Sequence, residues 1–249
     1  AGDLQVFKGI PFALPPVGAN RWKPPAPMPS WSGVRDATEF GAACVQPKPR
    51  AGSIYADEPP VMSEDCLFLN IWTPKNARKA PVFVWIHGGA LTSGASNLSM
   101  YEGSKLAGRG VVFVSINYRL GILGYLAHPE LSVESSEGIS GNYGLKDQIE
   151  ALRWIQRNIA AFGGDPNNVT IAGQSAGSLA VALLQASPEA RGLFHKVVGM
   201  SGSPFGEPLP AVALADAEKT GLTLQHTLGA HSIEDLRDIG GNKIVAATV

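Results

Sequence analysis

The sequence predicts an α/β fold with a mainly parallel, twisted sheet and helices on both faces. Short apolar runs alternate along the chain with segments of helical periodicity, the pattern of parallel strands joined by helices. Residues 81–86 and 111–116 are almost continuously apolar, which is typical of strands buried on both faces. A chain of 249 residues with 45% hydrophobic side chains can also bury a sizeable core.

The elements follow one another in a regular order. The first strands are predicted at residues 67–72, 81–86 and 111–116. A helix over about 145–161 follows, because apolar residues recur on one face: Leu145, Ile149, Leu152, Ile155 and Ile159. The Gly163-Gly164-Asp165-Pro166 stretch ends it. A strand at 168–172, a helix at about 176–185, a strand at 195–200 and helices at about 210–228 and 232–239 complete the chain.

The first part of the chain has a different character. Residues 11–60 are rich in proline, which leaves little room for long elements, yet they contain Phe12, Trp22, Trp31 and Phe40. We therefore expect residues 1–66 to be a loop-rich but packed covering segment and residues 67–249 to be the sheet core. No internal repeat or linker is visible, so residues 1–249 are predicted to belong to a single domain.

Composition argues against several classes of function. The net charge is −1 and no basic run occurs, so nucleic acid is not an expected partner. No apolar stretch approaches the roughly 18 residues of a membrane span. The N-terminal residues carry no signal-peptide pattern. Neither metal-ligand spacing nor a glycine-rich nucleotide loop appears, so no metal or cofactor is expected.

A serine between two glycines follows the strand predicted at 168–172. The stretch Gly173-Gln174-Ser175-Ala176-Gly177 fits the G-x-S-x-G turn that joins a strand directly to a helix. Such a turn is tight, needs small flanking residues and presents the serine hydroxyl above the sheet beside a helix N-terminus. Ser175 is therefore the predicted nucleophile, with a capping serine in a glycine-rich loop as the alternative.

A second glycine-rich loop follows the strand at 81–86. His87-Gly88-Gly89-Ala90 would leave backbone N–H groups uncovered, as acyl transfer requires for a developing oxyanion. Together with the N–H after the serine, the predicted donors are Gly89, Ala90 and Ala176. We expect His87 to anchor this loop rather than to act as the base.

The two cysteines, Cys44 and Cys66, leave two possibilities open. They could form a disulfide that closes a surface loop and contributes roughly 3 kcal/mol to stability. They could equally be two reduced, buried thiols, because so small a number does not decide between the alternatives.

With these motifs the sequence resembles the type-B carboxylesterase and cholinesterase family of the α/β-hydrolase fold, and most of all its bacterial para-nitrobenzyl-esterase branch. The resemblance runs through nearly the whole chain. Its blocks are residues 7–13, 15–18, 21–22, 31–34, 63–71, 117–121, 141–148, 162–166 and 173–177.

The resemblance implies an ester hydrolase that works through an acyl-enzyme, with a small-molecule ester as substrate. Ser175 matches the nucleophile, and Gly89, Ala90 and Ala176 match the oxyanion donors. Cys44 and Cys66 match the first disulfide of the family. A disulfide makes a secreted or periplasmic location the expectation and the cytoplasm the alternative.

The sequence departs from the family pattern at three places. Gln174 stands where many members have glutamate, so recognition of a cationic group is less expected. Ala90 and Leu91 replace a glycine and an aromatic residue in the oxyanion loop, although Ala90 keeps its N–H. The acid and histidine of the triad are expected in a C-terminal half beyond Val249, since no histidine of this chain occupies a catalytic position: His87, His128, His195, His226 and His231.

Two other functions remain open at this stage. One is a non-catalytic, cholinesterase-like interaction domain, against which the retained Ser175 and donor loop count. The other is a hydrolase of different bond preference, such as an amidase or a feruloyl- or tannin-type esterase.

Overall fold

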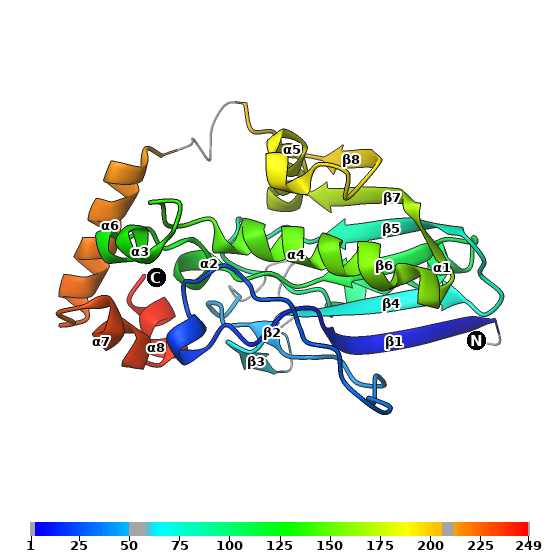
Figure 1. The fold of residues 1–249 in the computed structure, drawn as a ribbon, viewed down its shortest axis with the longest axis horizontal. Helices are drawn as coiled ribbons and strands as arrows, with labels where there is room; N and C mark the ends of the chain where they lie inside the picture. Colours follow the sequence, from blue (N-terminus) through cyan, green and yellow to red (C-terminus); the bar gives the residue numbers. More distant parts are fainter. Residues whose placement is uncertain (1–2, 50–58, 60, 206–211, 249) are drawn as a thin grey trace.

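The computed structural model of the protein describes residues 3–49, 59, 61–205 and 212–248. Its main element is a six-stranded sheet in the order β1-β4-β6-β5-β7-β8. The strands are β1 (Leu4–Pro11), β4 (Phe68–Pro74), β5 (Ala80–Ile86), β6 (Val112–Ile116), β7 (Gly164–Gln174) and β8 (Lys196–Met200). β1, β4 and β6 pair antiparallel, whereas β6, β5, β7 and β8 pair parallel. The mainly parallel sheet is thus confirmed (Figure 1).

Helices cover both faces of this sheet. The α-helices are α1 (Ser104–Ala107), α2 (Gly121–Tyr125), α3 (Pro129–Glu134), α4 (Tyr143–Asn158), α5 (Ala176–Ala186), α6 (Leu214–Thr227), α7 (Ile233–Asp238) and α8 (Gly241–Ala246). Ala107 of α1 packs with Phe113, whereas α4 and α5 pack in the cluster that contains Val112 and Val114. Because successive side chains of a strand point to opposite faces, α1 lies on one face and α4 and α5 on the other.

The core has two main parts. The larger cluster lies between the sheet and helices α4 and α5, and its strand residues are almost entirely shielded from solvent. The second cluster joins α2, α3, α6, α7 and α8 to Trp22 and Val45 of the N-terminal segment. Figure 1 shows α6, α7 and α8 together at the left, the side toward which the arrows of β5 and β7 point.

Several short elements differ from the sequence-based expectation. The segment 1–66 is irregular over most of its described length, but residues 4–11 form β1 in the main sheet, and Ala43–Cys44 (β2) pairs with Met62–Ser63 (β3). β1 escaped prediction because a register shift between Phe7 and Ile10 interrupts the alternation of its side chains. Helices α1, α2, α3 and α8 were not predicted either, since each is shorter than two turns.

The longer elements agree with the prediction. α4 continues as a 3₁₀ turn (Ile159–Phe162) and ends at Gly163, which has φ 81°. Other 3₁₀ turns occupy Gly18–Asn20, Ser99–Tyr101 and Pro188–Ala190. α6 begins at Leu214, and residues 210–211 of the predicted helix lie outside the described part of the chain.

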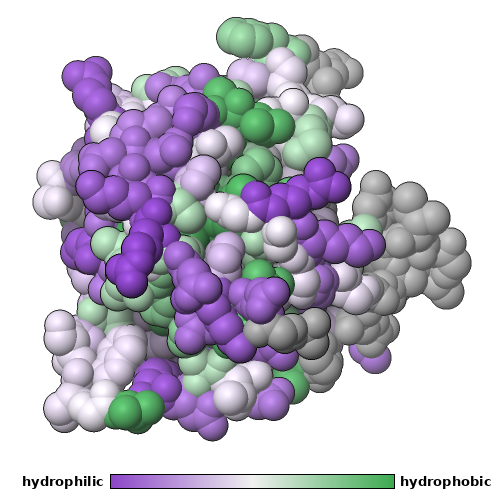
Figure 2. All heavy atoms as spheres, turned by 90° about the vertical axis from the view of Figure 1, so that its right-hand side faces the viewer, coloured by the Kyte–Doolittle hydropathy of each residue, from purple (hydrophilic) through white to green (hydrophobic). Residues whose placement is uncertain are grey.

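β8 is an edge strand with an exposed surface. It pairs with β7 on one side, and all five of its residues are exposed. They include the apolar side chains of Val197, Val198 and Met200. In Figure 2 hydrophilic side chains cover much of the end that faces the viewer, and hydrophobic patches lie near the top, the side on which Figure 1 places β8.

Candidate active site

The serine turn, residues 173–177, joins β7 directly to α5. Ser175 has φ 56° and ψ −122°, a conformation that side chains rarely adopt. A Cβ on Gly173 would lie 2.3 Å from the carbonyl oxygen of Gly177, and one on Gly177 would lie 2.1 Å from that of Ile86. Both positions therefore require glycine, and the strand and helix that the motif needs are both present.

The glycine loop, residues 87–94, follows β5 and lies against the serine turn. A Cβ on Gly88 would lie 2.6 Å from the carbonyl oxygen of Gln174 and 3.3 Å from the Cβ of Ser175. The backbone then turns through three positive φ angles, 116° at Gly89, 54° at Ala90 and 61° at Leu91. The loop and the serine turn therefore touch through their backbones.

The three predicted oxyanion donors lie on these two segments. Gly89 and Ala90 belong to the glycine loop, and Ala176 is the first residue of α5. Within the described residues, no protein acceptor binds the N–H group of any of the three. Uncovered N–H groups at a helix N-terminus and a strained loop can stabilise a negative oxygen.

His87 anchors the glycine loop from within the core. Its side chain is buried, stacks on Tyr118 with ring centroids 4.4 Å apart, and its Nδ1 lies 2.8 Å from the carbonyl oxygen of Gly88. Because a carbonyl only accepts, Nδ1 carries the proton. Burial lowers the pKa of His87 to about 4, so the ring is neutral at pH 7.

The other histidines make contacts away from Ser175. His128 caps α3 and binds Gln225, with 2.6 Å between His128 Nε2 and Gln225 Oε1. His195 precedes β8, and its Nδ1 accepts a 3.2 Å hydrogen bond from the N–H of Val169. Since residue 196 pairs with residue 170, His195 is level with residue 169, which is six positions and roughly 20 Å along β7 from Ser175. His226 is exposed on α6, and His231 is exposed in the connection between α6 and α7.

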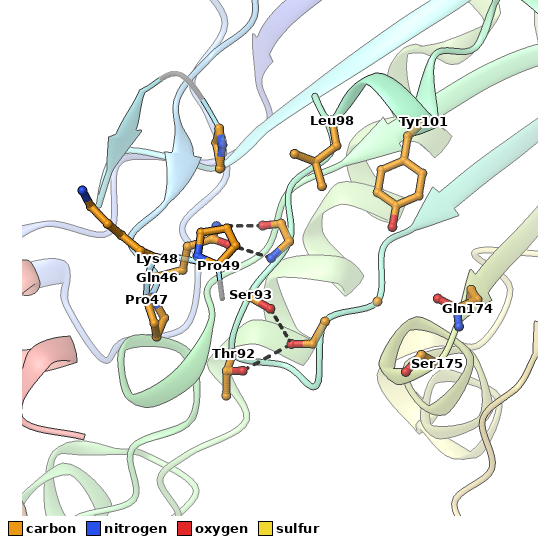
Figure 3. A pocket seen from close by; sticks show the side chains of 14 residues that line it. Gln46, Pro47, Lys48, Pro49, Thr92, Ser93, Leu98, Tyr101, Gln174 and Ser175 are labelled. Carbon is orange, nitrogen blue, oxygen red and sulfur yellow. Dashed lines mark hydrogen bonds between the residues drawn. The ribbon is translucent and has the colours of Figure 1, made fainter. Parts of the chain in front are cut away.

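A cavity of about 410 Å³ opens beside the serine turn. Ser175 and Gln174 line one side, and the glycine loop with Tyr101 lines another (Figure 3). Leu98 and five residues between the two cysteines also line it: Gln46, Pro47, Lys48, Pro49 and Pro59. Figure 3 shows the amine of Lys48 pointing away from Ser175.

The Cys44–Cys66 disulfide is present, with the two Cα atoms 5.0 Å apart. The segment that it closes lines the cavity, and the sequence analysis did not predict that these residues lie near Ser175. Gln46 was also missed. Its side chain binds the glycine loop at Gly94, 48 positions away along the chain, so no local sequence pattern could have revealed it.

The described residues offer neither a metal site nor a membrane-spanning helix. The described ranges contain no group of three or more histidine, cysteine, aspartate or glutamate residues placed to hold a metal ion. Nor does any helix within them have the length and apolar character that crossing a membrane demands.

Known proteins resemble this chain in sequence. The model of the carboxylesterase family matches residues 1–224. The fumonisin B1 esterase of Sphingopyxis macrogoltabida is 47% identical over 232 residues, 92% of this chain and 42% of that protein. The para-nitrobenzyl esterase of Bacillus subtilis (strain 168) is 49% identical over 202 residues, 80% of this chain and 40% of that protein. The cocaine esterase of Homo sapiens is 46% identical over 225 residues, 86% of this chain and 38% of that protein.

Solved structures agree with the sequence comparison. A PNB esterase structure superposes with a TM-score of 0.89 at 40% identity, covering 99% of this chain and 50% of that one. The fold is therefore that of an α/β-hydrolase. The chain belongs to the carboxylesterase family, and it spans half or less of the length of these relatives.

Proposed function

We propose that this chain carries the nucleophile and the oxyanion hole of a serine esterase. The observation that carries the proposal is the strained conformation of Ser175, at φ 56° and ψ −122°, where the serine turn meets the glycine loop at a cavity. Strain of this kind persists where the surrounding structure enforces it and is common in active sites. Membership of the carboxylesterase family supports the same reaction.

In the proposed reaction, the Ser175 oxygen attacks the carbonyl carbon of a small-molecule ester while a histidine takes the hydroxyl proton. The N–H groups of Gly89, Ala90 and Ala176 stabilise the oxygen that becomes negative. The alcohol leaves with the proton from the histidine, and Ser175 retains the acyl group. Water then attacks the acyl-enzyme by the same steps, releasing the acid and restoring the serine.

We propose that the histidine and the triad acid lie in a C-terminal half. Three observations support this: the ring nitrogens of His87, His128 and His195 bind groups other than Ser175, β8 exposes apolar side chains at the sheet edge, and the relatives are about twice as long. An uncovered apolar edge of a sheet is a surface that needs a partner. The disulfide supports a secreted or periplasmic location for the protein.

The substrate class follows from what stands near the serine. Gln174, beside Ser175 in the cavity lining, is neutral where many family members carry a negative charge. We propose that the enzyme cleaves carboxylic esters without requiring a cationic group. The relatives named for fumonisin B1, para-nitrobenzyl and cocaine esterase activity support ester cleavage.

The test is labelling of the native protein with a fluorophosphonate, which modifies activated serines, followed by mass spectrometry of every polypeptide present. We expect label on Ser175, loss of labelling in Ser175→Ala, and labelling unchanged in Ser178→Ala. Ser178 is the matched control because its hydroxyl donates to the carbonyl oxygen of Gly202 at 2.8 Å. Label without a second half would refute the C-terminal proposal. No label on an intact, full-length protein would refute the serine mechanism and favour a non-catalytic interaction domain.

A further inference from the structure

Gln46 connects the disulfide segment to the glycine loop. It lies two residues after Cys44 and is 8% exposed. Its Nε2 donates to the carbonyl oxygens of Cys44 at 3.0 Å and Gly94 at 2.9 Å, and its Oε1 accepts from the N–H of Gly94 at 2.7 Å. The amide therefore has all three hydrogen bonds with backbone groups. Two of them hold the N–H and the carbonyl oxygen of Gly94, and the third goes to Cys44 (Figure 3).

The glycine loop needs such a support because its conformation is costly. Ala90 and Leu91 have φ angles of 54° and 61°, in the left-handed region that residues with a Cβ rarely adopt. Four internal bonds shape the loop, and all of them end at the carbonyl oxygen of Gly89. The N–H groups of Thr92 and Ser93 donate to it at 3.0 and 2.9 Å, and the hydroxyls of the same two residues donate at 3.3 and 3.1 Å. These bonds close the turn upon itself, and the N–H of Gly121 holds its tip by donating to the carbonyl oxygen of Leu91 at 2.7 Å. None of them attaches the returning arm, residues 93–94, to the rest of the protein.

The returning arm packs directly on the arm that carries the donors. A Cβ on Gly94 would lie 2.5 Å from the carbonyl oxygen of Gly88, and one on Gly89 would lie 2.1 Å from that of Ser93. Gly88 in turn touches the backbone of Gln174. Because the two arms pack backbone against backbone, we expect a displacement of Gly94 to be transmitted to the peptides of Gly89 and Ala90.

We infer that Gln46 is a positioning residue for the oxyanion hole. By holding Gly94 it fixes the N–H groups of Gly89 and Ala90 relative to Ser175. The inference rests on the proposed function and deepens it. Gln46 acts on the transition state through the loop, so its loss should reduce stabilisation of the oxyanion more than binding of the ground state.

The test is Gln46→Met in the full native protein, since methionine matches glutamine in length and removes every hydrogen bond of the amide. We expect kcat for ester hydrolysis to fall about 10–100-fold, with KM changed less than about threefold, because a small displacement of a donor costs about that much. Binding of a trifluoromethyl ketone, which forms an oxyanion on the serine, should weaken by the same factor as kcat/KM.

The matched control is Gln156→Met. Gln156 also ties two segments together, its Nε2 donating to the carbonyl oxygens of Pro166 at 2.8 Å and Leu193 at 2.9 Å, but it lies outside the cavity lining. We expect it to lower the melting temperature without changing kcat. Equal loss of kcat in both variants, or a kcat within twofold of wild type in Gln46→Met, would overturn the inference.

A second variant covers the case in which Gln46→Met does not fold. In Gln46→Glu a carboxylate would face two carbonyl oxygens, and protonation would restore an O–H donor while retaining an acceptor. The kcat of this variant relative to wild type should rise as the pH falls from about 8 to about 5.5. A flat ratio would overturn the inference. Absence of any wild-type hydrolysis would instead overturn the proposed function, and the inference with it.

Discussion

The backbone N–H of Ser175 donates a 2.8 Å hydrogen bond to the carbonyl oxygen of Met200. Met200 is the last residue of β8 and pairs in register with Gln174. The hydrogen-bond ladder of the sheet therefore extends into the serine turn and holds Ser175 at its φ of 56°. The strained residue depends on an edge strand for part of its support.

This strain predicts an unusual response to substitution. Ser175→Gly should be more stable than Ser175→Ala by about 1 kcal/mol, because glycine adopts a positive φ without the cost that a Cβ imposes. Urea unfolding of the two variants measures the difference. The control pair is Ser178→Gly and Ser178→Ala within α5, where the order should reverse because glycine costs about 1 kcal/mol in a helix. An alanine variant at 175 as stable as the glycine variant would show that the turn is unstrained.

Gly177→Ala should disrupt the contact between α5 and β5. The added Cβ would lie 2.1 Å from the carbonyl oxygen of Ile86, and both groups belong to backbone that cannot move without separating the helix from the strand. We expect a loss of about 3 kcal/mol or more in the free energy of unfolding, or no soluble protein. Gly240→Ala, which meets nothing within 4 Å, should cost less than about 1 kcal/mol. Similar losses for the two variants would contradict the packing argument.

His87 should make the protein less stable in acid. Its pKa is lowered by burial to about 4, whereas an unfolded histidine has its ordinary pKa of 6.5. Between these values the unfolded state binds more protons, so stability is complete above pH 6.5 and falls as the pH decreases toward 4. The expected loss is on the order of 3 kcal/mol.

The measurement compares wild type with His87→Gln by urea unfolding at about pH 7.5 and about pH 4.5. The variant should lose less stability between the two pH values, since glutamine takes up no proton. Other acid-sensitive groups, such as Glu134, whose pKa is lowered by its hydrogen bond from Arg237, are common to both proteins and cancel. Parallel pH profiles would rule out His87 as a source of the acid sensitivity.

The disulfide should contribute to stability through the segment that it closes. The double variant Cys44→Ala/Cys66→Ala is expected to lose about 3 kcal/mol, the loop-closure entropy for cysteines 22 positions apart. Reduction of wild type with dithiothreitol should give the same loss, and the double variant should not respond to the reductant. A response of the double variant would mean that the reductant acts elsewhere.

The sequence predicted the strands at 81–86 and 111–116 to within a residue of β5 and β6, because burial on both faces makes a strand continuously apolar. It did not predict β1, whose side-chain alternation is broken by a register shift. Helices such as α2 and α3 span fewer than two turns and show no periodicity.

In the candidate site, too, local motifs were predictable from the sequence and tertiary contacts were not. The serine turn and the glycine loop were recognisable because each needs glycine at fixed positions within a few residues. Gln46 was not, since its partner Gly94 is distant in the chain and glutamine adopts many roles. Interactions that depend on tertiary contacts leave no local pattern in a sequence.

The Cys44–Cys66 disulfide marks the boundary between the main sheet, which carries Ser175, and the irregular segment that lines part of the cavity. The two Cα atoms stay 5.0 Å apart, and the chain between them contributes one side of the cavity. The disulfide makes that stretch a closed ring whose described residues contribute no strand to the main sheet, so residues of the ring other than Gln46 can be exchanged without altering the register of that sheet. Exchanging the part of this ring beyond Gln46 between members of the family should therefore reshape the cavity, while Gln46 is kept to hold the glycine loop.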